Sequence, residues 1–240
     1  NCNLQTVPAE VASLPALRVL NLEMNHLTAF PRELAGRIQA PLEQLYLGLN
    51  AEMTAFPEGV RGLRRLRVLH LDGTAIASIE HFRGLDSLTG LGLSGTPLTK
   101  LPAGAAWGNV RLRRLTLSNC PQLDWVQAFA ALAPQTSLNH LNISQNDLRA
   151  LSPLPSTAFP NLDTLVASNA QGVAALMPAL TAARRIKYLD ISRSRIDSLT
   201  LRQVLRLETL EYLDLSALDL KSIPEEVQYL REVHTLILQY

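Results

Sequence analysis

The side chains that could do chemistry in this sequence are five histidines, two cysteines and a recurring serine. The histidines and cysteines are His26, His70, His81, His140, His234, Cys2 and Cys120. A zinc site needs such ligands at short, characteristic spacings, and the sequence contains no such spacing. We therefore expect no metal site, and no residue pattern calls for another cofactor.

Serine recurs at one position of a repeated pattern, immediately after a run of alternating aliphatics. The copies are Ser94, Ser118, Ser144, Ser168, Ser192 and Ser216. A catalytic serine is a single residue activated by a neighbouring base, so six equivalent copies indicate a structural position, here the exposed end of a strand. The sequence also lacks a glycine-rich phosphate loop and a nucleophile elbow. We therefore expect no catalytic residue and no enzymatic activity.

The repeated pattern is a frame of Leu, two residues, Leu, one residue, Leu, found ten times at intervals of 22 to 26 residues. Its copies begin at Leu17, Leu42, Leu66, Leu88, Leu112, Leu138, Leu162, Ile186, Leu210 and Val233. Alternating Leu-x-Leu is typical of a strand with one buried face. The frame predicts short parallel strands in one continuous curved sheet, for example at 18–22, 43–47, 67–71, 113–117, 139–143, 187–191 and 211–215.

A small or polar residue follows each strand and should be buried. The position holds Asn25, Asn50, Thr74, Thr96, Cys120, Asn146 and Ser194. Such side chains can satisfy backbone groups freed where the chain turns, and Ala170 and Leu218 should interrupt this polar ladder. Cys2 takes the same position five repeats before Cys120, roughly 24 Å away at about 4.8 Å per strand. A disulfide cannot span that distance, so both thiols should be free, each in a small buried site.

The second half of a repeat must return the chain to the next strand. Five repeats do so with an apolar residue followed by proline: Val7-Pro8, Phe30-Pro31, Phe56-Pro57, Leu101-Pro102 and Ile223-Pro224. Proline is favourable at the first position of a helical turn, so we expect short helical turns there. The repeats starting at Leu66, Leu138, Leu162 and Ile186 lack this proline and should be more varied.

The full pattern, L-x-x-L-x-L-x-x-N/C-x-L over essentially all 240 residues, resembles that of the leucine-rich repeat family. The resemblance implies an α/β solenoid, a horseshoe with a parallel concave sheet and short helical, 3-10 or irregular convex segments. The repeat lengths resemble the intracellular or bacterial types. No linker is visible, so residues 1–240 are predicted to form a single domain of about ten repeats. Because both ends fall within repeats, we expect a fragment of a longer protein.

The family's concave face often holds a folded protein or a peptide, so the resemblance implies a protein-interaction module without catalysis. An alternative is a repeat segment of a larger signalling enzyme or cell-surface receptor. The net charge of +1 argues against nucleic acid as partner, and no apolar run approaches the ~18 residues of a membrane span. Without an internal disulfide a cytoplasmic location is expected, although disulfide-bearing caps outside the sequence would allow an extracellular one.

The outward-facing strand positions hold the candidate binding residues. Tyr188 and Tyr212 should be neighbours on consecutive strands, and so should Asp190 and Asp214. Adjacent like charges are unfavourable, whereas tyrosine is enriched at binding hot spots and paired carboxylates favour a Lys or Arg of a partner. The alternative is that Tyr-Leu-Asp is a repeat consensus that occurs twice.

A second, looser candidate group lies nearer the N-terminus. It comprises Tyr46, His70, Asp72 and Glu23, and further outward strand positions hold Arg114 and His140. Between the two groups, Gly90, Gly92 and Gly95 should leave a flat, bare strip.

Basic residues cluster just before three strands. They are Arg64, Arg65 and Arg67; Arg111, Arg113 and Arg114; and Arg184, Arg185 and Lys187. They are either solvated or able to bind an acidic partner or a phosphate-bearing surface. One glycosylation sequon, Asn142-Ile143-Ser144, falls on a strand, where so short a pattern also arises by chance.

Overall fold

The computed structural model describes residues 2–30 and 42–239. They divide into two compact units: unit 1 comprises Asn1–Thr116 and Gln122–Pro134, and unit 2 comprises Leu117–Pro121 and Gln135–Tyr240. Each unit is described by itself. That residues 1–240 form a single domain stays a prediction.

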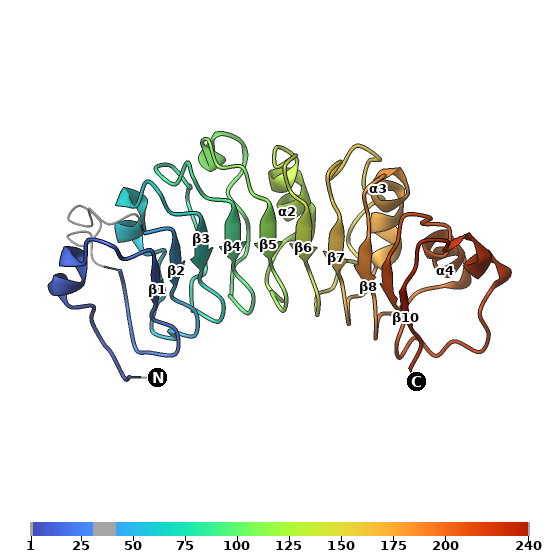
Figure 1. The fold of residues 1–240 in the computed structure, drawn as a ribbon, viewed down its shortest axis with the longest axis horizontal. Coiled ribbons are helices and arrows are strands. Elements are labelled where there is room, and N and C mark those ends of the chain that lie inside the picture. Colours follow the sequence, from blue (N-terminus) through green and yellow to red (C-terminus); the bar gives the residue numbers. More distant parts are fainter. Residues whose placement is uncertain (1, 31–41, 240) are drawn as a thin grey trace. The chain divides into compact units, whose positions relative to one another are not determined.

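Unit 1 contains five three-residue strands that pair in parallel in chain order (Figure 1). They are β1 (Val19–Asn21), β2 (Gln44–Tyr46), β3 (Val68–His70), β4 (Gly90–Gly92) and β5 (Arg114–Thr116). The returning segments hold the 3-10 helices η1 (Ala9–Ser13), η2 (Glu58–Gly62) and η3 (Gly104–Trp107) and the helix α2 (Trp125–Leu132). Parallel strands in chain order are what the leucine frame predicts.

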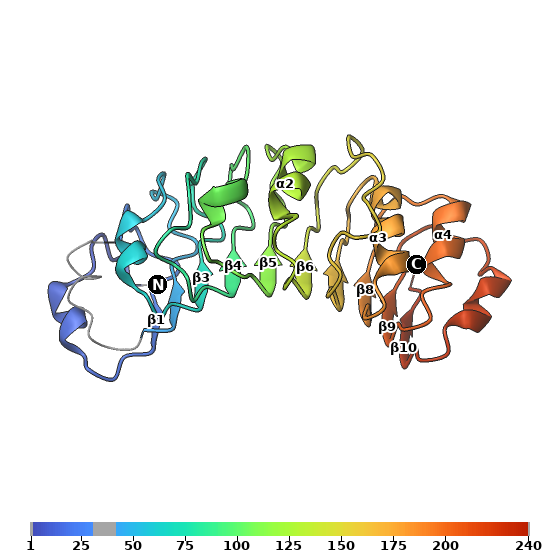
Figure 2. The same ribbon diagram turned by 90° about the horizontal axis from the view of Figure 1, so that it is seen from above.

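Unit 2 repeats this arrangement with five more parallel strands. They are β6 (His140–Asn142), β7 (Thr164–Val166), β8 (Tyr188–Asp190), β9 (Tyr212–Asp214) and β10 (Thr235–Ile237). Its returning segments hold η4 (Val173–Leu176), α3 (Met177–Ala182), α4 (Ser198–Val204) and η5 (Glu225–Tyr229). In both units the helical turns lie on one side of the strands, which leaves the other side of the strands uncovered (Figure 2). We call that uncovered side the strand face.

The core of each unit is a stack of leucines. The central residue of a strand is buried in β2 to β9, and Leu141 of β6 keeps 1% of its surface exposed. At the edge of unit 2, Leu236 of β10 is 36% exposed. Strands are three residues long rather than the predicted five, because a residue with positive φ follows within a few positions, such as Leu49 (φ 56°) or Arg193 (φ 58°). A left-handed residue ends the extended backbone.

The polar ladder is present as predicted. The buried Asn50 side chain donates to the Leu47 and Leu22 carbonyl oxygens (2.7 and 3.1 Å) and accepts from the Leu27 N–H (3.0 Å). Asn146 makes the equivalent bonds in unit 2. The ladder is interrupted at Ala170, whose N–H instead donates to Ser194 Oγ of the next repeat (3.1 Å). Asn50, Asn146 and Ser194 therefore tie neighbouring repeats together.

The two cysteines differ from each other. Both are free thiols, and Cys120 is buried at its ladder position as expected. Cys2 also takes the ladder position, since its N–H donates to Asn25 Oδ1 (3.1 Å), but its side chain is exposed. The expectation of a buried Cys2 is therefore wrong, because no described repeat packs on its outer side.

Short helical turns form after the prolines, but proline does not take the predicted position in them. Pro8, Pro57 and Pro224 stand immediately before η1, η2 and η5, as cap residues rather than as the first helical residue. η3 begins two residues after Pro102, and Pro31 lies outside the described residues. A cap residue has non-helical backbone angles, which proline's φ near −65° also allows. The segments after β7 and β8 form α-helices and the segment after β3 forms none, so the expected variety is confirmed.

Candidate functional site

The strand face of unit 2 carries two stacked tyrosines. Tyr188 on β8 stands opposite Tyr212 on β9 in the strand register. Their ring centroids lie 4.1 Å apart and the rings are 5° from parallel. The predicted neighbours are therefore in contact. Burial, the Tyr212 hydroxyl and the charges of Asp190 and Asp214 raise the pKa of Tyr188 to about 12. Its hydroxyl is therefore neutral at physiological pH and able to donate a hydrogen bond.

Two carboxylates stand beside the stack. Asp190 is opposite Asp214, each at the end of its strand. Oδ1 of Asp190 accepts from Ser192 N–H and Oγ (2.9 and 2.6 Å), and Oδ1 of Asp214 accepts from Ser216 N–H and Oγ (2.8 and 2.5 Å). Two like charges ~4 Å apart in water repel by about 1 kcal/mol, while a hydrogen bond to a charged group contributes about 1.5–3 kcal/mol. The serine donors therefore outweigh the repulsion that the sequence analysis expected.

The recurring serines have a different place from the one expected. Ser192 and Ser144 are buried, at 7% and 6% exposure, and Ser216 is half-buried. The exposed strand end is therefore a wrong assignment, and at Ser192 and Ser216 the hydroxyl donates to the aspartate two residues earlier. An aspartate followed two residues later by serine is a local turn signal that could have identified these donors. At the sequon, Asn142 Oδ1 likewise accepts from the N–H of the buried Ser144 (3.0 Å).

The geometry leaves binding capacity on the strand face. In the described part of unit 2, Oδ1 is the oxygen of each aspartate that takes the serine bonds, and no hydrogen bond or ion pair engages either Oδ2. The stack is flanked in register by small side chains, Thr164 on β7 and Thr235 on β10. We call Tyr188, Asp190, Tyr212 and Asp214 the tyrosine patch. It offers aromatic surface beside negative charge, which is the combination that a cationic side chain prefers.

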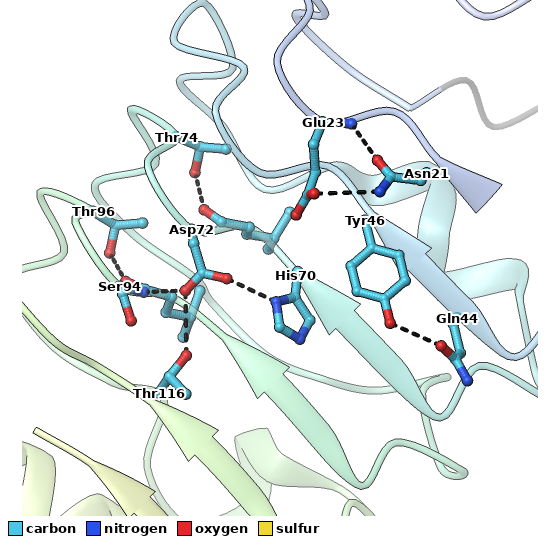
Figure 3. Close-up of polar contacts among 12 residues, drawn as sticks. Asn21, Glu23, Gln44, Tyr46, His70, Asp72, Thr74, Ser94, Thr96 and Thr116 are labelled. Carbon is cyan, nitrogen blue, oxygen red and sulfur yellow. Dashed lines mark hydrogen bonds and ion pairs between the residues drawn. The ribbon is translucent and has the colours of Figure 1, made fainter. Parts of the chain in front are cut away.

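The second predicted group lies on the strand face of unit 1, on β2 and β3 (Figure 3). The rings of Tyr46 and His70 have centroids 5.0 Å apart and are tilted by 42°. Tyr46 Oη donates to Gln44 Oε1 (2.8 Å), and His70 Nδ1 lies 3.0 Å from Asp72 Oδ2. The structure therefore brings Tyr46, His70 and Asp72 together as predicted.

Asp72 also reaches across two further repeats. Its Oδ1 accepts from Ser94 N–H (2.7 Å) and from Thr116 Oγ1 (3.2 Å), as Figure 3 shows. Burial alone would raise its pKa, but the hydrogen bonds from His70 and Ser94 keep the pKa of Asp72 below its ordinary value. Both oxygens are thus occupied within unit 1.

This reach corrects the expectation of a bare glycine strip. Gly90 and Gly92 are buried. A Cβ at Gly92 would lie 2.2 Å from Asp72 Oδ2, so the carboxylate fills the space that a side chain there would need. Gly95 remains exposed.

The remaining candidates are not part of either group. Glu23 accepts from Asn21 Nδ2 (3.3 Å) and donates its N–H to Asn21 Oδ1 (2.9 Å), without a hydrogen bond to Asp72 or His70. Arg114 is exposed on β5 of unit 1 and His140 is half-buried on β6 of unit 2. Within residues 2–30 and 42–239, no cluster of three or more His, Cys, Asp or Glu is placed to hold a metal ion.

No family model matches the chain. Lumican of Gallus gallus is 31% identical over 160 residues, 65% of this chain and 43% of lumican. PH domain leucine-rich repeat protein phosphatase 1 of Rattus norvegicus is 34% identical over 103 residues, 42% of this chain. This chain spans only 6% of the phosphatase.

Solved structures share the fold. A leucine-rich repeat protein of Leptospira interrogans matches with a TM-score of 0.74 and 21% identity, over 99% of this chain and 64% of its own. A chain of the mouse RP105/MD-1 complex matches with a TM-score of 0.71 and 22% identity, over 98% of this chain and 44% of its own. The ten repeat copies and these matches show that the chain has the leucine-rich-repeat fold. Among its described helices, none combines the length and apolar character of a bilayer span.

Proposed function

We propose that this chain is a protein-interaction module that binds a basic segment of a partner protein through the tyrosine patch. The observation that carries the proposal is the stacked Tyr188–Tyr212 pair beside two aspartates whose Oδ2 atoms remain open. Two rings packed against each other lose little freedom on binding, which is why tyrosine serves as a hot-spot residue. The open oxygens can accept hydrogen bonds from a guanidinium or ammonium group.

The comparisons support an interaction role without naming the partner. A chain with this fold occurs in the mouse RP105/MD-1 complex, an assembly of two proteins by its description. The matches to a phosphatase and to an adenylate cyclase of Schizosaccharomyces pombe cover 6% and 13% of those proteins. These matches favour a second candidate: that the module serves a larger signalling protein whose chemistry lies elsewhere. The sequence of the complete polypeptide tests it, since a catalytic domain or membrane span would be visible there.

The binding proposal is tested with a defined probe. A fluorescein-labelled peptide with four arginines separated by glycines should bind the wild-type protein, and its glutamate counterpart should not. Tyr188→Ala with Tyr212→Ala should weaken binding about thirtyfold, since truncating a hot-spot tyrosine costs about 2 kcal/mol.

Tyr229→Ala is the matched control, because Tyr229 is half-buried on η5, away from the strands. It should leave the affinity for the arginine peptide unchanged. Equal affinity of the wild-type protein and the Tyr188/Tyr212 double variant would overturn the proposal.

A further inference from the structure

Unit 1 has a strongly basic edge that the tyrosine patch does not use. Five arginines stand just before β3 and β5, a sixth is the first residue of β5, and all six are exposed. They are Arg64, Arg65, Arg67, Arg111, Arg113 and Arg114, and we call them the arginine rim. The whole chain has a net charge of +1, so this edge concentrates positive charge that the rest of the molecule balances.

Backbone hydrogen bonds fix how the two groups of arginines are spaced. The Thr89 N–H donates to the Arg67 carbonyl oxygen (2.9 Å), and the Arg113 N–H donates to the Thr89 carbonyl oxygen (2.7 Å). Arg67 and Arg113 therefore stand one strand to either side of Thr89, roughly 9.6 Å apart at about 4.8 Å per strand. Between the groups, Ser87 donates its Oγ to the Arg64 carbonyl oxygen (2.8 Å). Small neutral side chains thus separate two groups of guanidinium groups.

The guanidinium groups of the rim are unpaired. Among the described residues, none of the six forms an ion pair, whereas Arg18, Arg149, Arg202 and Arg206 each pair with a carboxylate. Arg111 Nη1 donates to the adjacent Val110 carbonyl oxygen (2.9 Å), a hydrogen bond that leaves the charge unpaired. Asp86, an exposed carboxylate between β3 and β4, does not pair with them. Unpaired like charges on one edge raise the local potential and attract an anionic partner.

All six basic residues are arginine rather than lysine. A guanidinium is a planar fork that binds a carboxylate or phosphate through two parallel hydrogen bonds, which an ammonium group cannot do. The rim therefore suits oxyanions held at defined points better than a diffuse negative field.

We propose that the arginine rim binds an acidic segment of a partner protein in an extended conformation, with carboxylates three residues apart. In the polyproline II form of an extended chain there are three residues per turn and each advances about 3.1 Å, so carboxylates three residues apart lie on one side of the segment, about 9 Å from each other. That distance matches the spacing of the two arginine groups. Single-stranded nucleic acid is disfavoured because its binding sites add aromatic residues on which bases stack, and the rim contains none. The rim lies in unit 1 and the tyrosine patch in unit 2, so a negative result for one of the two proposed sites does not count against the other.

The experiment measures fluorescence anisotropy of a labelled twelve-residue peptide, (Glu-Ser-Gly) repeated four times. Wild-type protein should bind it with an affinity that falls as salt is raised, and the peptide with Gln in place of Glu should not bind. Arg67→Ser with Arg113→Ser should weaken binding at least tenfold. Arg193→Ser with Arg195→Ser removes the same charge from exposed positions of unit 2 and should change the affinity less than twofold.

Four further results are decisive. Equal weakening by both double variants would show that net charge alone attracts the peptide, and would overturn the proposal. So would binding of single-stranded DNA or phosphatidylserine vesicles, but not of the peptide, to wild-type protein. If Arg67→Ser with Arg113→Ser lowers the unfolding midpoint, Arg64→Ser with Arg111→Ser must show the tenfold loss instead. Tyr188→Ala with Tyr212→Ala should leave binding of the acidic peptide unchanged.

Discussion

The two aromatic and acidic groups use the strand faces of their own units in opposite ways. In unit 2 the acids Asp190 and Asp214 stand at the strand ends, and a serine two residues later satisfies one oxygen of each. In unit 1 the strand end is His70 and the acid comes two residues later, where Asp72 is held by His70, Ser94 and Thr116. The first arrangement leaves an oxygen of each acid open, whereas the second leaves none.

A glycine in the neighbouring strand makes this difference possible. Asp72 can lie over β4 because Gly92 has no side chain there. In unit 2 the paired positions on the next strand carry side chains, Asp214 beside Asp190 and Ile237 beside Asp214, and each aspartate accepts from a serine of its own repeat. Asp72 is therefore a structural group that ties three repeats together, and the two aspartates of the tyrosine patch remain available to a partner.

The largest expected effect comes from filling the space over Gly92. Gly92→Ala should destabilise the protein by about 3 kcal/mol, because the new Cβ displaces the Asp72 carboxylate from its donors and crowds a packed site. Gly90→Ala is the matched control on the same strand, since its Cβ would meet Val68 Cγ2 at an ordinary 3.4 Å. Urea unfolding should show little change for Gly90→Ala. Equal midpoints for the two variants would mean that Asp72 does not occupy the space over Gly92.

The next prediction distinguishes the carboxylate that stabilises the fold, Asp72, from the two that we propose bind a partner, Asp190 and Asp214. Asp72→Asn should cost about 1.5 kcal/mol, because one amide cannot accept all the bonds that a charged carboxylate accepts. Asp190→Asn with Asp214→Asn should cost less than the single change, since an amide oxygen still accepts from Ser192 and Ser216. The double variant should nevertheless lose affinity for the arginine peptide. If Asp72→Asn is the change that abolishes peptide binding, the roles of the two groups are reversed.

A third prediction concerns how the stability that Asp72 contributes depends on pH in the acidic range. The pKa of Asp72 is lowered in the folded protein, so the folded state binds this proton more weakly than the unfolded state. The stabilisation is therefore complete above the ordinary aspartate pKa, about 3.9, and is lost as the pH falls through the folded pKa below it. The difference in unfolding free energy between wild type and Asp72→Asn should shrink below about pH 4. A difference that stays constant from pH 6 to pH 3 would contradict the lowered pKa.

The leucine frame is enough to predict the fold, since each strand centre from β2 to β9 is buried and, within each unit, neighbouring strands pair in the expected register. The same frame predicts the contact of Tyr188 with Tyr212, because equal repeat lengths keep equivalent positions side by side. The repeat periodicity does not predict the hydrogen-bond partners of the acids. Asp72 can extend across two strands because Gly92 has no side chain in its path. A repeat pattern predicts where each residue lies along the strands, but it does not predict how far a side chain extends from there. The serine donors were recognisable locally, but their recurrence suggested exposed strand ends.

The smallest effect tests the environment of the tyrosine patch in alkali. Burial first, then Tyr212 and the two aspartates, raise the pKa of Tyr188 to about 12, above the ordinary tyrosine value of about 10. The folded state therefore holds this proton more tightly than the unfolded state. Its contribution to stability is complete below about pH 10 and is lost as the pH rises from there towards 12.

The absorbance change of tyrosine ionisation, measured as wild type minus Tyr188→Phe, should have its midpoint near 12. Replacing both acids, Asp190→Asn with Asp214→Asn, should lower that midpoint, because less negative charge then opposes ionisation. Asp72→Asn serves as the control and should not move it, since Asp72 does not contribute to the shift of Tyr188. A midpoint near 10 in the wild type would show that the Tyr188 hydroxyl is solvated, and the stack would then lack the desolvated ring surface on which the binding proposal relies.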